Sequence, residues 1–418
     1  MTWILFGGLA VLLIMGMPIG FALMIASVGA MLFIDMGLKS VPLTLFHGTT
    51  SFVVLAVPLF ILMGELMSAT SIARRIVDFA SALVGWMRGG LANVNVLANM
   101  FMAEISGSAV ADAAALGKIF VPQMARVGYP KAFAVTVTAA AAIIGIIIPP
   151  SIPMVLYGAV TNTSIRDIFI AGIVPGVMLV VAFIITNYIF ARKEGHPVDR
   201  EFDLPSVVRT AHGAIVPLLL PVVVVGGLIS GIFTPTEAAA VGVVLALVFG
   251  LARRELSWKT GYRLLVDSTH QTASVMMILA GSAVLGQVLA NEQIPQQMVE
   301  AMGGITNTAF GFLLLVNAIL LVAGMFLQAP AAIIVIVPVL LPMALQLGID
   351  PVHFGVIVCV NLALGQQTPP VATVLLTVCS ISGVRMHETF RYMNWYILAM
   401  LVVLALVTYV PYLTLWFK

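Results

Sequence analysis

The chain has 418 residues, of which 61% are hydrophobic and only 9% are charged, and its net charge is +2. A soluble globular protein carries roughly 25% charged residues, so this chain must use lipid as its outer solvent. The near-neutral charge leaves no nucleic-acid footprint. Both cysteines, Cys359 and Cys379, lie in apolar segments, which argues against a disulfide framework or a thiolate metal site.

Apolar segments recur along the whole chain, and a membrane-spanning helix needs about 20 such residues. The first run, 3–34, is long enough to cross twice around Gly16 and Pro18. It lacks the basic start of a signal peptide, so we expect it to be retained. Further on, single spans are predicted at about 46–68, 168–191, 268–290 and 392–416, and a second double crossing at 213–251.

Two moderately apolar segments, Ser71–Arg88 and Asn291–Gly304, each lie between a predicted span and a predicted hairpin. Amphipathic helices along the membrane surface fit this composition and could brace a stationary scaffold around a moving core. Simple loops are the alternative.

An internal repeat relates the two halves of the chain. Every member of one set recurs 220 positions later: Pro122, Gly128, Gly145, Pro149 and Pro150 return as Pro342, Gly348, Gly365, Pro369 and Pro370. We therefore predict two structural repeats, 1–210 and 211–418. Each contains a re-entrant hairpin (about 89–126 and 305–345) followed by a broken transmembrane helix (about 131–160 and 353–380).

The distribution of basic residues predicts that the repeats are inverted. Arg74 and Arg75 of the first half align with Gln296 and Gln297 of the second, and cytoplasmic loops carry an excess of Lys and Arg. Five crossings in the first half, an odd number, would turn the second half upside down. With the N-terminus outside, only three of the 19 basic residues fall outside, namely Lys39, Arg166 and Lys418.

Four interruptions fall inside apolar segments, two in each half. Non-helical backbone at membrane depth is tolerated only where it lines a protein-buried or watery site, and paired interruptions indicate a transport site. Prolines remove backbone donors and free carbonyls of the preceding turn, while Ser, Thr and Gln offer hydroxyl and amide groups. The interruptions are Glu104–Ala109, Gly145–Ser151, Gly324–Pro330 and Gly365–Thr373.

A few carboxylates lie in or near apolar stretches, where an ionised group is costly and functional by default. Asp112 follows the first hairpin tip and could bind a cation, order the tip or pair with Lys118. Glu104 adjoins the same tip and could stabilise it, whereas structural roles are the better interpretation for Glu65 and Glu237. None of the six histidines has a spacing typical of a metal site or a catalytic pair.

These four interruptions, together with the rest of the chain, resemble the large membrane subunit of tripartite ATP-independent periplasmic (TRAP) transporters. The resemblance covers essentially the full length and is most specific at Glu104–Asp112, Gly145–Pro153, Gly324–Pro330 and Gly365–Thr373. It implies an all-α polytopic membrane protein with two inverted-topology repeats and an elevator-type mechanism. A core of hairpins and broken helices would then move against a scaffold.

The resemblance also implies which residues form the sites. The first Na⁺ site would consist of Ser106, Ser108, Gly145, Ile148 and Pro150. The second would consist of Gly324, Gly365, Thr368 and Val371, mostly through backbone carbonyls. The candidates for the surroundings of the substrate are Ser106, Gly107, Asp112, Gln328, Gln367 and Thr373.

The expected function is Na⁺-coupled import of an organic acid through a bacterial inner membrane, with the N-terminus in the periplasm. The expected partners are a periplasmic substrate-binding protein, a separate small four-helix membrane subunit and the lipid bilayer. No phosphate-binding loop is present, which argues against an ATPase. Sialic acids, C4-dicarboxylates, sugar acids and keto acids all remain open as substrates.

Three alternatives compete with this interpretation. A stand-alone Na⁺/dicarboxylate symporter would need no binding protein. An intramembrane enzyme would need a nucleophile with a base or a metal pair, but Ser106 and Ser108 have no nearby histidine in the sequence, so we expect no enzyme. A passive channel is disfavoured because paired re-entrant tips suit occlusion better than an open pore.

Overall fold

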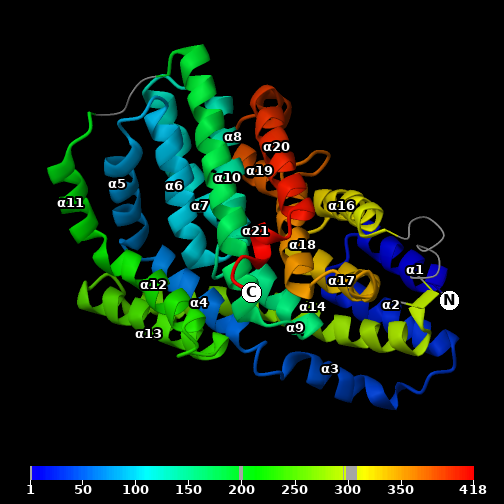
Figure 1. The fold of residues 1–418 in the computed structure, drawn as a ribbon. Coiled ribbons are helices and arrows are strands. Elements are labelled where there is room, and N and C mark those ends of the chain that lie inside the picture. Colours follow the sequence, from blue (N-terminus) through cyan, green and yellow to red (C-terminus); the bar gives the residue numbers. More distant parts are fainter. Residues whose placement is uncertain (1, 197–200, 295, 298–307) are drawn as a thin grey trace.

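The computed structural model describes residues 2–196, 201–294, 296–297 and 308–418; the side chains of 2–4, 73, 103–106 and 216 lie outside this description. Helices form every regular element within these ranges, and no strand occurs among them. Figure 1 shows one helical body in which the helices of the two halves lie against each other.

The chain begins with two antiparallel helices, α1 (Thr2–Ile14) and α2 (Ile19–Phe33), within the segment 3–34 that the sequence predicts to cross twice. Both are shorter than the about 20 residues of a typical spanning helix, so the double crossing stays a prediction. The turn between them contains Gly16 at a φ of +80°, a conformation that glycine adopts without steric cost. The short 3-10 helix η1 (Leu38–Ser40) follows.

The run 46–68 is not the single helix that we predicted. It contains the end of α3 (Val41–Thr49) and all of α4 (Ala56–Ser68), with non-helical residues between them. Hydroxyl groups at the break compete for backbone partners, because Thr50 donates to the Phe46 carbonyl at 2.9 Å and Ser51 accepts from the Val54 amide at 3.3 Å.

Helix α5 (Ile72–Val84) is amphipathic, in agreement with the predicted arm at Ser71–Arg88. Its buried residues Ile72, Ile76 and Ala80 recur every fourth position, and Arg74 and Asp78 are exposed. The corresponding prediction for Asn291–Gly304 falls largely outside the described residues.

The first hairpin consists of α6 (Gly90–Ser106) and α7 (Ala109–Arg126). The broken helix follows as α8 (Lys131–Ala142), the 3-10 turn η2 (Ile143–Ile146) and α9 (Ile152–Thr161), and α10 (Ile165–Glu194) returns along it.

The second half begins with α11 (Leu204–Gly213), α12 (Ile215–Ile229) and α13 (Pro235–Ala252). Thr234 and Glu237 form a reciprocal capping box at the start of α13, which gives Glu237 the structural role that we expected. Helix α14 (Trp258–Asn291) is ten residues longer at its start than the predicted run, because the Ser257 hydroxyl caps it by accepting from the Thr260 amide at 3.1 Å.

The second hairpin and broken helix repeat the first at nearly constant spacing. They are α16 (Ala309–Phe326), α17 (Ala329–Gln346), α18 (Pro351–Gly365) and α19 (Thr373–Ser382), followed by α20 (Met386–Tyr409) and the short α21 (Tyr412–Leu415). Helices α17 and α18 begin 220 residues after α7 and α8. The inverted relation of the halves and their boundary at residue 210 stay predictions.

The two halves interlock through their hairpins. Helix α7 packs against α19 of the other half, and α17 and α18 pack against α9. Small residues allow these approaches: a Cβ on Gly117 would lie 3.4 Å from the Val378 side chain, and one on Gly355 would lie 2.5 Å from the Tyr157 ring. Outside this core, α14 lies along α2, α3 and α4 (Figure 1).

Six described helices are long and apolar enough to cross a bilayer by length and composition: α10, α13, α14, α16, α17 and α20. Helices α16 and α17 are among them, although the sequence predicts a re-entrant hairpin there. The depth of both hairpins in the membrane therefore stays a prediction.

Candidate functional site

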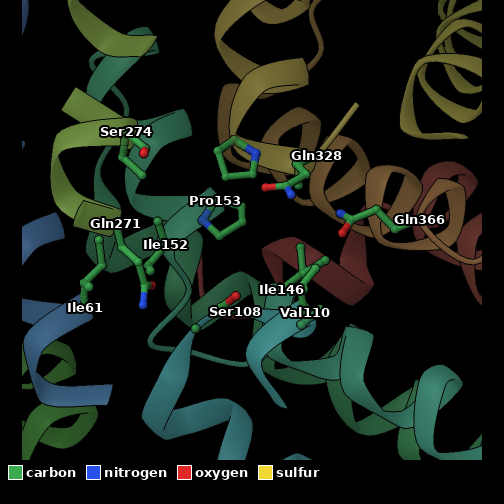
Figure 2. Close-up of a pocket in the computed structure, with 15 residues that line it drawn as sticks. Ile61, Ser108, Val110, Ile146, Ile152, Pro153, Gln271, Ser274, Gln328 and Gln366 are labelled. Atoms are coloured by element: carbon green, nitrogen blue, oxygen red, sulfur yellow. The ribbon is translucent and has the colours of Figure 1, made fainter. Parts of the chain in front are cut away.

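Both hairpin tips line one cavity of about 230 Å³. The first tip contributes Gly107 and Ser108, and the second contributes Gln328. Ile146 of the first break and Gln366 of the second also border it. Figure 2 shows Gln271 and Ser274 on one side of this space, Gln328 and Gln366 on the other, and Ser108 between them.

The first tip rests directly on the first break. Gly107 has a φ of +58°, and a Cβ placed there would lie 3.3 Å from the Pro150 carbonyl oxygen and 3.3 Å from the Ile152 amide nitrogen. Ser108 is the N-cap of α7, and its hydroxyl accepts from the Ala111 amide at 3.4 Å. The positive dipole end of α7 therefore begins at the cavity.

Asp112 lies in the first turn of α7 and is only 1% exposed. It does not line the cavity, and its role at the tip stays a prediction. The side chains of Ser106 and Glu104 lie outside the described ones, although the backbone of both belongs to α6.

The first break is held by Ser151, which no part of the sequence argument singled out for this role. Its hydroxyl donates to the Ile146 carbonyl at 2.5 Å, and it caps α9 by accepting from the Met154 amide at 3.4 Å. Gly145 is buried in η2, and the side chain of Ile148 fills the space above Gly176 of α10. Pro149 and Pro150 are joined by a cis peptide bond, as are their counterparts Pro369 and Pro370.

The second tip turns between Phe326 and Ala329, and Gln328 is the N-cap residue of α17. Its side chain makes no cap hydrogen bond and extends toward the cavity in Figure 2. Close below it, Gly324 meets Gly365: a Cβ on Gly324 would lie 3.0 Å from the Gly365 Cα. Only glycine at both positions permits this approach of the hairpin to the broken helix.

The second break contains two short hydrogen-bonded turns. The Thr368 amide donates to the Gly365 carbonyl and its hydroxyl donates to the Leu364 carbonyl, both at 2.9 Å. The Val374 amide reaches back to the Gln366 carbonyl at 3.3 Å, after Ala372 at a φ of +50°. Val371 and Thr373 lie between these contacts and do not line the cavity.

Two adjacent glutamines of this break have different environments. Gln367 is fully buried, and its amide donates to the Ala139 carbonyl of α8 at 2.5 Å, so it joins the two broken helices. Gln366 instead lines the cavity. The sequence favours Gln367 for the substrate surroundings, but Gln366 is the one that lines this cavity, because a one-residue offset in non-helical backbone cannot be judged from spacing. The substrate role of Gln367 stays a prediction.

Asparagines tie each hairpin to its own broken helix. Asn95 of α6 donates to the Thr138 hydroxyl of α8 at 2.6 Å. In the second half the broken helix is the donor instead, since Asn361 of α18 donates to the side-chain oxygen of Asn317 on α16 at 2.7 Å. Buried and partly buried hydrogen bonds of this kind fix the register of the helices that frame the cavity.

The remaining wall comes from helices outside the hairpins and broken helices. Gln271, Ser274 and Val275 of α14 and Ile61 of α4 border the cavity. Gln271 also donates to the Glu65 carboxylate of α4. The sequence carries only a weak signal for this wall, since Gln271 and Ser274 stand three positions apart on one helix face but lie within the polar stretch 267–274.

The oxygen donors around the two breaks suit a hard cation of low charge. Among the described residues, no three His, Cys, Asp or Glu side chains gather as a metal site would require. Carbonyls of unwound helices and hydroxyls are the ligands by which discontinuous helices hold Na⁺. The Thr368 hydroxyl gives its one hydrogen to Leu364, which leaves oxygen lone pairs for a cation.

Comparison with solved structures shows the same fold. The Alcanivorax borkumensis YdaH transporter, whose structure is described as having an unusual topology, matches 91% of this chain and 90% of its own with a TM-score of 0.62. The sequence identity is 14%, so this similarity concerns the fold alone.

Comparison with known sequences is more specific. The C4-dicarboxylate TRAP transporter large permease protein DctM of Pseudomonas aeruginosa is 39% identical over 92% of this chain and 90% of its own length. The sialic acid TRAP transporter large permease protein SiaM of Vibrio cholerae is 37% identical over 98% of this chain and 96% of its own. The 2,3-diketo-L-gulonate TRAP transporter large permease protein YiaN of Escherichia coli is 34% identical over 97% of this chain and 95% of its own.

The family model described as "Tripartite ATP-independent periplasmic transporter, DctM component" matches residues 6–413. The expected resemblance is thereby confirmed over nearly the whole chain. The relatives are transporter permease subunits, so the expectation that this protein is no enzyme is confirmed as well. The chain belongs to the DctM family of large, membrane-embedded TRAP transporter permease subunits.

Proposed function

We propose that this permease subunit imports an organic acid anion across the bacterial inner membrane, coupled to the inward movement of Na⁺. The anion would be delivered by a periplasmic binding protein. A separate small four-helix membrane subunit would complete the complex, with the N-terminus of the present chain in the periplasm.

The observation that carries this proposal is the shared cavity of the two hairpin tips. Ser108, Gln328 and Gln366 give it hydroxyl and amide groups, and no Lys or Arg lines it among the residues that the structure describes. The first turns of α7 and α17 begin at its wall, so the positive ends of both helix dipoles favour an anion there. An anion held in this way can be released again, as transport requires.

The relatives support an acid as the substrate. C4-dicarboxylates, sialic acid and 2,3-diketo-L-gulonate, which appear in the names of the three relatives, share a carboxylate group and differ in the rest of the molecule. The carboxylate is therefore the feature that we expect the cavity to recognise.

Two Na⁺ ions would bind at the two breaks. In the first half the proposed ligands are Ser106, Ser108, Gly145, Ile148 and Pro150. In the second half they are Gly324, Gly365, Thr368 and Val371. Each ion would place positive charge beside the anion and hold a tip against its break, and the membrane potential contributes about 2.3 kcal/mol per charge per 100 mV.

The loaded core would then move against a scaffold that includes α14 and α4. In support of this step, the cavity is lined by residues of both hairpin tips and of α14, so it borders both the proposed core and the proposed scaffold. As the core moves, the hairpin tips would leave Gln271 and Ser274 of the scaffold and contact other scaffold residues.

Uptake by proteoliposomes that contain all three proteins tests the function. We expect accumulation of a labelled carboxylate only with the binding protein, the small subunit and an inward Na⁺ gradient. Uptake unchanged by removal of the gradient would contradict the coupling, and uptake by this chain alone would favour a stand-alone symporter.

Topology can be tested independently with single cysteines in place of Arg74 and Gln296. We expect a membrane-impermeant maleimide to reach the two positions from opposite sides. Labelling of both from one side would contradict the inverted repeat.

A further inference from the structure

A second polar cavity, which shares no lining residue with the cavity at the hairpin tips, lies between the arm helix α5 and helix α11. Its volume is about 460 Å³. It is lined by Ser71, Arg74, Arg75, Asp78, Arg209, Thr210, Gly213 and Glu255. Nothing in the transport mechanism proposed above makes use of it.

The three arginines of this cavity differ in whether the protein itself engages their guanidinium groups. Arg75 is tied to the fold, since it donates to the Gly213 carbonyl at 2.8 Å and to the Ser71 hydroxyl at 3.2 Å. Arg74 and Arg209 are exposed, and within the described ranges no carboxylate lies within 4.0 Å of either guanidinium. Two guanidinium groups on facing helices thus remain available to a ligand.

The two carboxylates of the cavity do not cancel this charge. Glu255 accepts from the Ser71 amide at 2.8 Å, which engages it at the start of α5. Arg253 and Arg254 directly precede Glu255, so the region holds five arginines against the carboxylates of Asp78 and Glu255. The excess of guanidinium groups suits phosphate, which accepts paired hydrogen bonds from arginine.

The outer face of α11 is apolar beside this charge. Leu204 and Val208, one turn apart, are 60% and 62% exposed, and Phe202 just before the helix contacts the ring of Trp86. Arg209, Thr210 and Gly213 of the same helix line the cavity. An interfacial helix of this kind keeps apolar side chains in the acyl region and basic ones at the headgroups.

We propose that this cavity binds the phosphate headgroup of an anionic phospholipid, through Arg74 and Arg209, while the acyl chains lie along Leu204 and Val208. The basic residues around it are those predicted to face the cytoplasm, where anionic headgroups attract basic residues. The bound lipid would join the arm α5 to α11 and thus brace the scaffold. The apolar face favours a lipid over free phosphate, which would need only the arginines.

Native mass spectrometry of delipidated protein titrated with phosphatidylglycerol or phosphatidylcholine tests the proposal. We expect selective binding of phosphatidylglycerol, weakened about fivefold by each of the changes Arg74→Gln and Arg209→Gln. Arg75 is left unchanged because it supports the fold. The double change to lysine should keep most of the binding, since it keeps the charge.

Arg126→Gln is the matched control, because Arg126 is an exposed arginine at the end of α7 on the same predicted side. Equal weakening by this control, or no weakening by the double glutamine variant, would overturn the proposal. Arginine-dependent binding of inorganic phosphate as tight as that of the lipid would assign the cavity to a free anion. Release of the lipid on addition of the small subunit would assign the surface to that subunit. Either of these last two results would overturn the proposal of a lipid site.

Discussion

Gly324 and Gly365 contact each other through their backbones at the point where the second hairpin meets the second broken helix. A Cβ built on Gly365 would lie 2.6 Å from the Gly324 Cα and 2.7 Å from its carbonyl carbon. These atoms belong to the backbone of α16 and cannot rotate away. The second tip, the second break and two proposed Na⁺ ligands therefore depend on one pair of residues without side chains.

The change Gly365→Ala should force the hairpin away from the break. We expect a loss of about 1–3 kcal/mol of stability, as for overpacked cores, and loss of most Na⁺-driven uptake. Thermal unfolding in detergent and proteoliposome uptake are the measurements. Gly286→Ala in α14 is the control, since a Cβ there meets nothing within 4 Å. A Gly365→Ala protein with normal uptake would show that the contact is dispensable.

The change Gln328→Glu should impair binding of an anionic substrate. It preserves the shape of the side chain and adds a negative charge at the cavity, so we expect the KM for uptake to rise at least about tenfold. Gln346→Glu makes the same change at the exposed far end of α17 and should leave uptake near normal. Equal effects of the two changes would remove Gln328 from the site.

The neighbours Gln366 and Gln367 should respond in opposite ways to replacement by leucine. Gln366→Leu removes a cavity-lining amide, so we expect a KM about tenfold higher with nearly unchanged stability. Gln367→Leu removes the hydrogen bond to Ala139, so we expect a loss of about 1 kcal/mol in the free energy of unfolding. A reversed pattern in uptake and unfolding would restore Gln367 as the substrate residue.

The change Thr368→Val should weaken the coupling to Na⁺. Valine keeps the shape of threonine but lacks the oxygen, so we expect the Na⁺ concentration for half-maximal uptake to rise about tenfold. Thr368→Ser keeps the hydroxyl oxygen, so we expect its Na⁺ concentration for half-maximal uptake to stay near that of the unchanged protein. Thr377→Val is the control, because Thr377 likewise donates to a carbonyl one turn earlier, that of Thr373, at 2.8 Å. Unchanged Na⁺ dependence in Thr368→Val would exclude this ligand.

The link between Glu255 and α5 should depend on pH. The pKa of Glu255 lies below its ordinary value of 4.5, mainly because its carboxylate accepts hydrogen bonds from the side chain and the amide of Ser71. The positive charges of Arg75 and Arg253 lower it further. Because the folded state favours the ionised form, this stabilisation is present above pH 4.5 and is lost as the pH falls through the lowered pKa. Glu255→Gln should lower Tm at neutral pH and have no effect in acid, as thermal unfolding at several pH values would reveal. A difference in Tm independent of pH would contradict this account.

Much of the fold could be predicted because lipid imposes simple rules on a sequence. Helices of membrane length, the turn at Gly16 and the placement of both hairpins followed from apolar run lengths and glycine or proline positions. The division of 46–68 into α3 and α4 did not, because hydroxyl groups that compete for backbone carbonyls leave the average hydropathy of the run unchanged.

The site was predicted in part for the same reason. The two tips stood out because Ser, Gly and Gln are unusual at membrane depth, and both tips line one cavity. The wall formed by Gln271 and Ser274 was missed, since α14 is distant in sequence from either hairpin and no local pattern says which face meets the tips.

By itself the sequence determined that this protein lies in a membrane, that its helical elements recur at a constant spacing, and which family it belongs to. Hydropathy and proline positions are local properties of the chain, so they can be read without coordinates. Only the tertiary structure decided that Gln366 rather than Gln367 borders the cavity, that Gly324 touches Gly365, and that α14 completes the wall. Those facts depend on how helices far apart in the sequence pack, and packing is set by the shapes of both partners at once.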